Sequence, residues 1–380
     1  MKLLIIGSDG FIGRNLCAHL RSRGYSELLK YTRTSEPEAL ERYAAECGFV
    51  FHLAGVNRPD SPEDFEENHT FTTALLEALE RCGNKAPVLF ASSVQAELEN
   101  PYGQSKRRAE ALLQDYAART GVNVFICRLP GVFGKWCRPN YNSVVATFCD
   151  AAANGQPLRI DDPGARLTLA YIDDVANAFI DVLAHAPARQ GDFCTVAPVY
   201  RTTVGTLAAL ITAFGESRAG LAVPDMGDAL TAKLYSTYVS YLPGDCLGYP
   251  LAVHADARGW FAEFLKSENG GQVSVNVSKP GFTKGGHWHH GKIEKFLIVS
   301  GTGVIRLQRL GGGRVLEYPV SGERPKVVEV PPGYIHTVEN TGANDLVMVI
   351  WASQRFDPQR PDTYPAAVDG GETKLLTGKG

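Results

Sequence analysis

Two different rhythms of apolar and polar residues divide the chain. In the first part, short apolar runs are followed by longer stretches in which apolar residues recur with helical spacing. Such alternation of strands and helices predicts a doubly wound α/β domain built around a parallel sheet. The expected strands are residues 2–6, 28–31, 49–55 and 88–93. Helices are expected from Phe11 to about Arg23, and from about Tyr102 to about Arg119.

The rhythm changes after about Gly244. From there, short runs of alternating apolar and polar residues are separated by turns rich in glycine and proline. Many short strands at this spacing are typical of an all-β barrel or sandwich. We expect strands at 272–278, 295–301, 303–310, 326–331 and 346–352, with residues 311–313 at a hairpin tip. The predicted organisation is therefore a first domain over 1–244, a second over 245–368 and a polar tail over 369–380.

Composition narrows the class of protein. Of the 380 residues, 44% are apolar and 21% are charged, which suffices for sizeable cores in two domains. A formal charge of −3 favours neither nucleic acid nor an anionic membrane as a partner. No apolar run could span a bilayer, and Gly7 interrupts the opening MKLLII, so a buried first strand is expected rather than a secretion signal. The eight cysteines form no CxxC pair, which favours reduced thiols and a cytoplasmic location.

The stretch 7-GSDGFIG-13 lies between the first strand and the first helix. Gly7 allows a tight turn, Gly10 lets backbone amides approach a pyrophosphate, and Gly13 allows helix and strand to pack closely. The helix N-terminus adds unpaired N–H groups and a positive dipole. Glycines alone would serve any tight turn, but this strand–turn–helix context predicts a dinucleotide site.

The second strand is followed by 31-YTRTS-35. An NAD site has a carboxylate about twenty residues beyond the glycines, which binds the ribose hydroxyls. Arg33 occupies that region here, and a guanidinium suits the 2′-phosphate of NADPH. NADPH is therefore the expected cofactor. The alternative is that Arg33 is a solvated surface residue.

A second motif follows the strand at 88–93. Tyr102 and Lys106 are spaced Y-x-x-x-K at the start of a helix, downstream of Ser93. Residues four apart share one face of a helix. The ammonium can therefore stabilise a tyrosinate and lower the phenol pKa from its ordinary value of about 10. The tyrosine can then exchange a proton with a substrate oxygen while a nicotinamide transfers hydride.

These pieces, with 52-HLAG-55, 128-RLPGVFG-134 and 171-YIDDVA-176, resemble the extended short-chain dehydrogenases/reductases, which include nucleotide-sugar epimerases, dehydratases and reductases. The resemblance implies Ser93, Tyr102 and Lys106 as the catalytic trio, with Ser92 as the alternative serine. It implies cofactor contacts from Gly7, Gly10, Phe11, Ile12, Gly13, Arg33, Leu53, Ala54 and Lys106. Candidate sugar or diphosphate ligands in the following loop, which could equally be ordinary loop residues, are Arg138, Asn140 and Asn142.

The second domain contains 285-GGHWHHGKIEKF-296. On a strand, His287 and His289 point to one face and His290 to the other. Glu294 follows a turn, and 331-PPGYIHTVEN-340 supplies His336. Two imidazoles, a carboxylate and a third imidazole fit a divalent ion such as zinc, with room for water or substrate.

The same stretches resemble the cupin family. Its motif G-x5-H-x-H-x4-E-x6-G is matched by Gly281, His287, His289, Glu294 and Gly301, and its motif P-x-G-x2-H-x3-N by Pro331, Gly333, His336 and Asn340. A metal-free cupin whose histidines line a polar pocket is the alternative. The stretch 254-HADARGWFAEF-264 also resembles the nucleotide-sugar 4-keto-6-deoxyhexose epimerases, in which the histidine matching His287 is a base. Ligand and base roles exclude each other, so with a metal present His290 or Tyr334 becomes the candidate for proton transfer.

A ketosugar would link the two domains. A 4-ketone acidifies the hydrogen on C3, so epimerisation at C3 has to precede reduction of the ketone. The two domains in this order resemble a family of bifunctional capsular-polysaccharide enzymes over about residues 1–365. That resemblance implies C3 epimerisation and then NADPH-dependent C4 reduction of a UDP-4-keto-6-deoxy-N-acetylhexosamine. The product would be UDP-2-acetamido-2,6-dideoxy-L-talose, on the route to UDP-N-acetyl-L-fucosamine.

Two other functions stay open at this point. One is a reductase or epimerase of a different, dTDP-linked ketosugar. The other is a non-enzymatic NADPH-binding regulator with a sugar-sensing cupin. A homodimer or homotetramer is expected, because cupins often pair through their sheets.

Overall fold

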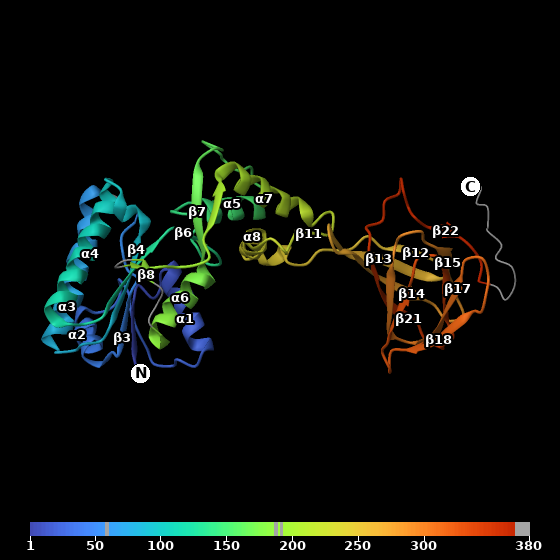
Figure 1. The fold of residues 1–380 in the computed structure, drawn as a ribbon, viewed down its shortest axis with the longest axis horizontal. Helices are drawn as coiled ribbons and strands as arrows, with labels where there is room; N and C mark the ends of the chain where they lie inside the picture. The colour runs from blue at the N-terminus through green and yellow to red at the C-terminus, as the bar shows by residue number, and fades with distance from the viewer. Residues whose placement is uncertain (58–60, 186–188, 191–192, 369–380) are drawn as a thin grey trace. The chain divides into compact units, whose positions relative to one another are not determined.

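The structure is a computed structural model, and it describes residues 1–57, 61–185, 189–190 and 193–368. The chain forms two compact units (Figure 1). The first comprises Met1–Ala213 and Lys233–Pro243, and the second comprises Phe214–Ala232 and the chain from Gly244 onward. The chain therefore passes between the units three times, and nothing in the sequence pattern indicates that residues 214–232 belong with the second unit.

The first unit is built around a mostly parallel seven-stranded sheet in the order β2-β1-β3-β4-β5-β9-β8. Its strands are β1 (Leu3–Ile6), β2 (Leu28–Tyr31), β3 (Phe49–His52), β4 (Val88–Ser93), β5 (Val124–Leu129), β8 (Arg189–Gln190) and β9 (Phe193–Cys194). Only the pairing of β8 with β9 is antiparallel. This confirms the doubly wound sheet. The third strand ends at His52, three residues earlier than the sequence pattern predicts, so Leu53 begins a loop.

Helices cover both faces of this sheet (Figure 1). On one face lie α1 (Phe11–Ser22) and α6 (Ile172–Ala184), packed on Leu3, Ile5 and Phe51. On the other lie α2 (Pro37–Glu46), α3 (Glu66–Arg81) and α4 (Pro101–Thr120), packed on Leu4 and Ile6. Successive strand residues point to opposite faces, and both faces are covered, which is why these strands are apolar throughout.

The remaining elements of this unit lie beyond the main sheet. A small sheet has the order β10-β7-β6, formed by β6 (Gly131–Phe133), β7 (Arg166–Tyr171) and β10 (Tyr200–Thr203). The other helices are α5 (Val144–Ala153), α7 (Val204–Ser217) and α8 (Ala229–Val239), with 3-10 turns η1 (Pro62–Phe65) and η2 (Val94–Glu97). The chain passes from one unit to the other within α7 and within α8, and the turn η3 (Gly244–Cys246) belongs to the second unit. In the described part of the chain, no helix has the length and apolar character needed to cross a membrane.

The second unit is a barrel of two sheets, as expected for a cupin. One sheet has the order β11-β13-β14-β21-β16-β19, with β12 beside β13, and the other has the order β18-β17-β20-β15-β22. The strands of the first sheet are β11 (Ala222–Val223), β12 (His254–Asp256), β13 (Gly259–Ser267), β14 (Gly271–Ser278), β16 (Glu294–Ser300), β19 (Val327–Val330) and β21 (Leu346–Ala352). Those of the second are β15 (Thr283–Trp288), β17 (Thr302–Arg309), β18 (Leu316–Ser321), β20 (Tyr334–Asn340) and β22 (Tyr364–Pro365).

The inward-facing residues of the two sheets meet in one apolar core. Phe296, Ile298 and Met348 contribute from the first sheet, and Ile305 and Val338 from the second. The strands expected from the sequence are all present, within a residue or two at their ends. Residues 311–313 lie in the connection between the antiparallel strands β17 and β18, so the hairpin tip is confirmed.

Candidate functional site

The glycine loop has the geometry that its spacing predicts. Gly7 follows β1 with φ +80°, a left-handed conformation that favours glycine. A Cβ on Gly13 would lie 2.1 Å from the carbonyl oxygen of Gly7, so only glycine lets α1 approach the loop this closely. Helix α1 has neither a capping side chain at Gly10 nor an acidic residue in its first turn. Its N-terminal N–H groups therefore remain available to the phosphates of a dinucleotide.

The other expected cofactor residues lie at the same edge of the sheet. Leu53 and Ala54 follow β3, which pairs with β1, so their loop adjoins the glycine loop. Ala54 packs so closely on Gly7 that a Cβ added to Gly7 would lie 2.9 Å from the Ala54 nitrogen. Arg33 follows β2 with 81% of its side chain exposed, 4.0 Å from a Glu67 carboxylate oxygen. An exposed guanidinium with one weak partner is free to turn toward a phosphate, and its role stays a prediction.

Tyr102 and Lys106 lie on the first turns of α4. Asn100 caps the helix by accepting a hydrogen bond from Gly103 N at 2.7 Å. A Cβ on Gly103 would lie 2.0 Å from the Gln95 carbonyl oxygen, so this glycine lets the start of α4 pack directly on η2. Burial raises the pKa of the Tyr102 phenol, and its hydrogen bond to Ser93 acts in the opposite direction. The structure therefore brings Ser93 and Tyr102 together, but the expected lowering of the phenol pKa by Lys106 is not found, because the effect of burial outweighs that of the hydrogen bond.

The Lys106 ammonium is fully enclosed. It donates to the Ala91 carbonyl at 3.1 Å and lies 4.8 Å from the centre of the Phe90 ring. A Cβ on Gly55 would come within 2.9 Å of its nitrogen, so Gly55 is what leaves room for it. Burial lowers the pKa of Lys106 to about 8, although the nearby Glu110 carboxylate partly offsets this. At neutral pH the group is a buried cation facing the loop that follows β3.

Ser92 has a different role from Ser93. Its hydroxyl donates to the buried Glu110 carboxylate at 2.5 Å. Arg128 binds both oxygens of the same carboxylate, at 3.0 and 2.6 Å. This network ties β4 and β5 to α4, and it turns Ser92 away from Tyr102. Neither Glu110 nor Arg128 was expected in this role; the one signal in the sequence is that Glu110 lies one helical turn beyond Lys106.

The three candidate substrate ligands lie in one exposed loop between β6 and α5. Arg138 stacks over the Tyr141 ring at 5.4 Å. The Asn140 N–H donates to Thr147 Oγ1 at 3.0 Å, and Asn140 has φ +55°. Asn142 is exposed next to them. The structure places these residues on the same surface loop, and their contact with a substrate stays a prediction.

In the second unit, a bulge aligns two of the candidate metal ligands. The register between β15 and β20 shifts between Gly285 and His287, which places His287 directly opposite His336. Gly285 and Gly286 have φ values of +96° and +77°. A Cβ on Gly285 would lie 2.6 Å from the His336 carbonyl oxygen. The glycines that open this stretch therefore shape the strand that carries the histidines.

His287, His289, Glu294 and His336 form a cluster in which one ligand atom from each residue lies within 4.8 Å of all the others. Ligands bound at about 2.1 Å to one zinc ion lie at most about 4.2 Å apart, so the cluster would contract slightly around a cation. Glu294 Oε2 lies 3.3 Å from Nε2 of both His289 and His336. The four residues come from β15, the turn after it, β16 and β20.

The electrostatics of the cluster suit a cation. Burial lowers the pKa of His287 to about 4 and that of His336 to about 3, so both imidazoles are neutral at physiological pH. Burial by itself would raise the pKa of Glu294, but its contact with His289 holds that pKa below its ordinary value. The buried Glu294 carboxylate is therefore a negative charge that the neutral His287 and His336 do not balance.

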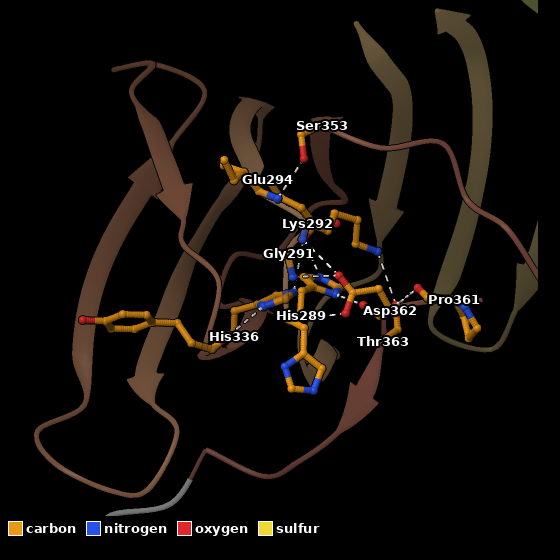
Figure 2. Close-up of polar contacts among 12 residues, drawn as sticks. His289, Gly291, Lys292, Glu294, His336, Ser353, Pro361, Asp362 and Thr363 are labelled. Atoms are coloured by element: carbon orange, nitrogen blue, oxygen red, sulfur yellow. Dashed lines mark hydrogen bonds and ion pairs between the residues drawn. The ribbon is translucent and has the colours of Figure 1, made fainter. Parts of the chain in front are cut away.

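His289 provides the most direct test of whether a metal fits. Its Nδ1 lies 2.5 Å from the Asp362 carbonyl oxygen, an acceptor only, so Nδ1 carries the proton (Figure 2). Nε2 lies 3.3 Å from the Glu294 carboxylate, and in the neutral form of the imidazole it presents a lone pair there, so that these two acceptors form no hydrogen bond with each other. Nε2 is buried and has no hydrogen-bond partner among the described residues. A divalent ion between these atoms would satisfy both, so the residues present fit a metal.

The two alternative proton-transfer residues lie outside the cluster. His290 is exposed and packs between Trp288 and Tyr364, with ring centres 4.5 and 4.9 Å away. It points to the opposite side from His287, as the alternation predicts. Tyr334 is half-buried and packs against the apolar core of the barrel.

Comparison with known protein families finds a matching family model in each of the two units. The model of the NAD dependent epimerase/dehydratase family matches residues 3–196, and that of the polysaccharide biosynthesis C-terminal domain matches residues 254–364. The chain belongs to the NAD dependent epimerase/dehydratase family. Membership implies a nicotinamide dinucleotide as cofactor, in agreement with the glycine loop.

Relatives of this family extend over both units. The chain is 44% identical to UDP-2-acetamido-2,6-beta-L-arabino-hexul-4-ose reductase of Pseudomonas aeruginosa, over 98% of this chain and 100% of the relative. The crystal structure of the capsular polysaccharide assembling protein CapF of Staphylococcus aureus is similar with a TM-score of 0.90 and 42% identity, over 97% of this chain and 100% of that one. The chain is thus CapF-like throughout, which confirms the resemblance seen in the sequence.

Proposed function

We propose that the chain is a bifunctional nucleotide-sugar enzyme. Its barrel epimerises C3 of a UDP-4-keto-6-deoxy-N-acetylhexosamine, and its first unit reduces the C4 ketone with NADPH to UDP-2-acetamido-2,6-dideoxy-L-talose. The observation that carries the proposal is that one chain holds both the Ser93–Tyr102–Lys106 group and the buried cluster of three histidines and Glu294. The name of the Pseudomonas relative supports the substrate, since it describes a reductase of a UDP-linked 2-acetamido hexul-4-ose.

In the first unit, the side chains supply proton chemistry around the hydride transfer that NADPH provides when bound. Tyr102 donates its proton to the C4 oxygen, and Ser93 holds that oxygen by a second hydrogen bond. Lys106 remains a cation below about pH 8 and stabilises the tyrosinate that results. The intact tyrosine and lysine weigh against a purely regulatory protein, because regulators of this kind typically lose that pair.

In the barrel, His287 takes the role of ligand rather than base, together with His289, Glu294 and His336. When bound, a divalent ion such as zinc would supply positive charge against the negative charge that develops on the ketone oxygen. Removal of the C3 proton requires the ketone, so this step precedes reduction. With His287 as a ligand, His290 or Tyr334 is the candidate that takes this proton, and a proton returned to the opposite face of C3 completes the inversion. Three of the four residues are almost fully buried, so the ion would lie in a dry part of the barrel.

Replacing Tyr102 by Phe separates the two steps. We expect reduction to fall by about 10²–10⁴-fold, while solvent deuterium still enters the substrate at C3. Tyr116→Phe is the matched control, because Tyr116 is a buried tyrosine of the same helix α4 but lies nearly four turns further along it. Loss of deuterium exchange in the Tyr102 variant would contradict the division of labour between the units.

Metal analysis tests the barrel. The purified chain is expected to hold about one equivalent of a divalent metal, and Glu294→Ala to lose both the metal and the C3 exchange. Comparing UDP- with dTDP-linked ketosugars in an NADPH oxidation assay tests the nucleotide. Turnover of the dTDP sugar alone would favour the alternative substrate, and turnover of neither would favour the regulator.

The expected homodimer is also part of the proposal. On the outer side of the larger sheet of the barrel, Leu297 pairs with Val349 on one neighbour and with Val327 on the other. Val299 and Val327 are 46% and 55% exposed. An apolar outer face of this kind suits pairing with a second copy. The homodimer would be contradicted if light scattering gave the mass of a single chain and Val327→Glu left that mass unchanged.

A further inference from the structure

The segment 362–366 lies along strand β15, which carries His287. Strand β22 pairs with β15, which places Pro365 opposite His287 and Tyr364 opposite Trp288. The Ala366 N–H donates to the Gly286 carbonyl at 2.9 Å. This pairing fixes the backbone around Asp362, a residue that the sequence motifs do not include.

The Asp362 carboxylate binds three consecutive backbone N–H groups. Oδ1 accepts from His290 at 2.8 Å, and Oδ2 accepts from Gly291 at 2.9 Å and Lys292 at 3.0 Å (Figure 2). These residues form the turn between His289 and Glu294. A carboxylate that receives three charge-assisted hydrogen bonds holds such a turn in one conformation. The spacing of two cluster members therefore depends on a side chain about seventy residues away in sequence.

The main chain of the same residue fixes the His289 ring. Its carbonyl accepts the Nδ1 proton, which sets the tautomer and aims Nε2 at the cluster. Asp362 also has φ +39°, a conformation that non-glycine residues rarely adopt. Strained backbone of this kind persists where the surrounding contacts demand it, and it gathers at functional sites.

We propose that Asp362 is a positioning residue for the metal site: it holds the turn 290–292 with its carboxylate and the His289 imidazole with its carbonyl, so that His289 and Glu294 meet one cation. This inference rests on the proposed metal site of the barrel. Partners that orient a metal-binding histidine through its other nitrogen typically change metal affinity by 10- to 100-fold when they are removed.

The test uses the full chain and zinc ions alone. Zinc affinity is measured by competition with a chromophoric chelator for the unsubstituted chain, Asp362→Ala, Asp362→Asn and Asp357→Ala. Asp357 is the matched control, since its carboxylate accepts a backbone hydrogen bond from Gln359 at 2.9 Å in the same segment and touches none of the four cluster residues. We expect about 10- to 100-fold weaker binding for Asp362→Ala, a smaller loss for Asp362→Asn, which keeps one acceptor oxygen, and no change for Asp357→Ala.

A second measurement separates positioning from a general loss of structure. In the metal-free chain with nitrogen-15 histidine, the His289 signal is expected to show a protonated Nδ1, and Asp362→Ala to show a mixture of tautomers. The dispersion of the methyl proton signals of the metal-free chain serves as a check that the barrel of each variant is folded. If both Asp362 variants kept the zinc affinity and the His289 tautomer of the unsubstituted chain, the positioning role of Asp362 would be refuted, while the proposed metal site would stand. An unsubstituted chain that binds no zinc would instead refute the metal site itself, and with it this role of Asp362.

Discussion

The buried lysine offers a test in which stability and activity change in opposite directions. Lys106→Met keeps most of the side-chain volume and removes the ammonium, together with its hydrogen bond to the Ala91 carbonyl. Because the ammonium lies in a fully enclosed position, the folded protein holds a charge that the unfolded chain would hydrate freely. We therefore expect the variant to be more stable than the unsubstituted chain and to have lost reductase activity.

The magnitude follows from the pKa. Burial lowers the pKa of Lys106 from 10.5 to about 8, and at about 1.4 kcal/mol per unit the buried charge destabilises the folded state by about 3 kcal/mol at neutral pH. The Ala91 carbonyl left without its donor costs about 1–2 kcal/mol. The net expectation is that the free energy of unfolding rises by about 1–2 kcal/mol.

The pH dependence of the free energy of unfolding tests independently whether the Lys106 charge destabilises the folded state. Because the folded-state pKa is lowered, the unfolded chain binds more protons than the folded chain between about pH 8 and pH 10.5, so the stability of the unsubstituted protein rises with pH through that window. The advantage of Lys106→Met should therefore shrink by about 2 kcal/mol between pH 7 and pH 9.5. Titration of other groups is common to both proteins and cancels in the difference.

Urea unfolding followed by the helical circular dichroism signal measures this, since nearly all helical residues belong to the first unit. Lys233→Met is the matched control. Burial alone would lower the pKa of Lys233, but its pairing with Asp174 raises it, so that substitution should destabilise the protein at neutral pH. A Lys106→Met variant less stable than the unsubstituted chain, with a pH-independent difference, would refute the argument that the ammonium is held at a cost to stability.

Three further predictions concern the same unit. Ser93→Ala should lower the rate of reduction by about 10²-fold with little change in stability. Ser92→Ala leaves the buried Glu110 carboxylate without one donor and should lower the free energy of unfolding by about 1–3 kcal/mol. Equal effects of the two substitutions on the rate would contradict the assignment of Ser93 to the catalytic group. Gly103→Ala places a Cβ 2.0 Å from a backbone carbonyl of η2 and should lower both melting temperature and turnover, and a variant with normal kinetics would show that the start of α4 can shift freely. Arg33→Ser should weaken NADPH binding by about tenfold or more and leave NADH binding nearly unchanged in a fluorescence titration; parallel losses for both cofactors would argue against a 2′-phosphate contact.

Much of the local structure could be predicted from the sequence because its causes are local. The apolar runs at β1 and β4 mark strands buried on both faces, and the glycine spacing at residues 7–13 reflects one positive φ and one close approach. The histidine and glutamate positions of the cupin motif are likewise visible, since strand alternation puts His287 and His289 on one side. The outward position of His290 follows from the same rule.

Other features depend on packing between distant segments. Ser92 and Ser93 are neighbours on β4, and only the positions of Glu110 and Tyr102 on α4 decide which serine joins the catalytic group. The assignment of residues 214–232 to the second unit is of the same kind, because it follows from contacts across the chain and not from a local pattern.

The sequence by itself thus determined the two folds, the dinucleotide loop and the set of residues able to bind a metal, because backbone conformation, side-chain alternation and chemical type are properties of short stretches. Only the tertiary structure decided how those residues are oriented. Asp362 shows why: its carboxylate and carbonyl reach the His289 turn through hydrogen bonds that span about seventy residues, and contacts at that separation leave no mark on local periodicity.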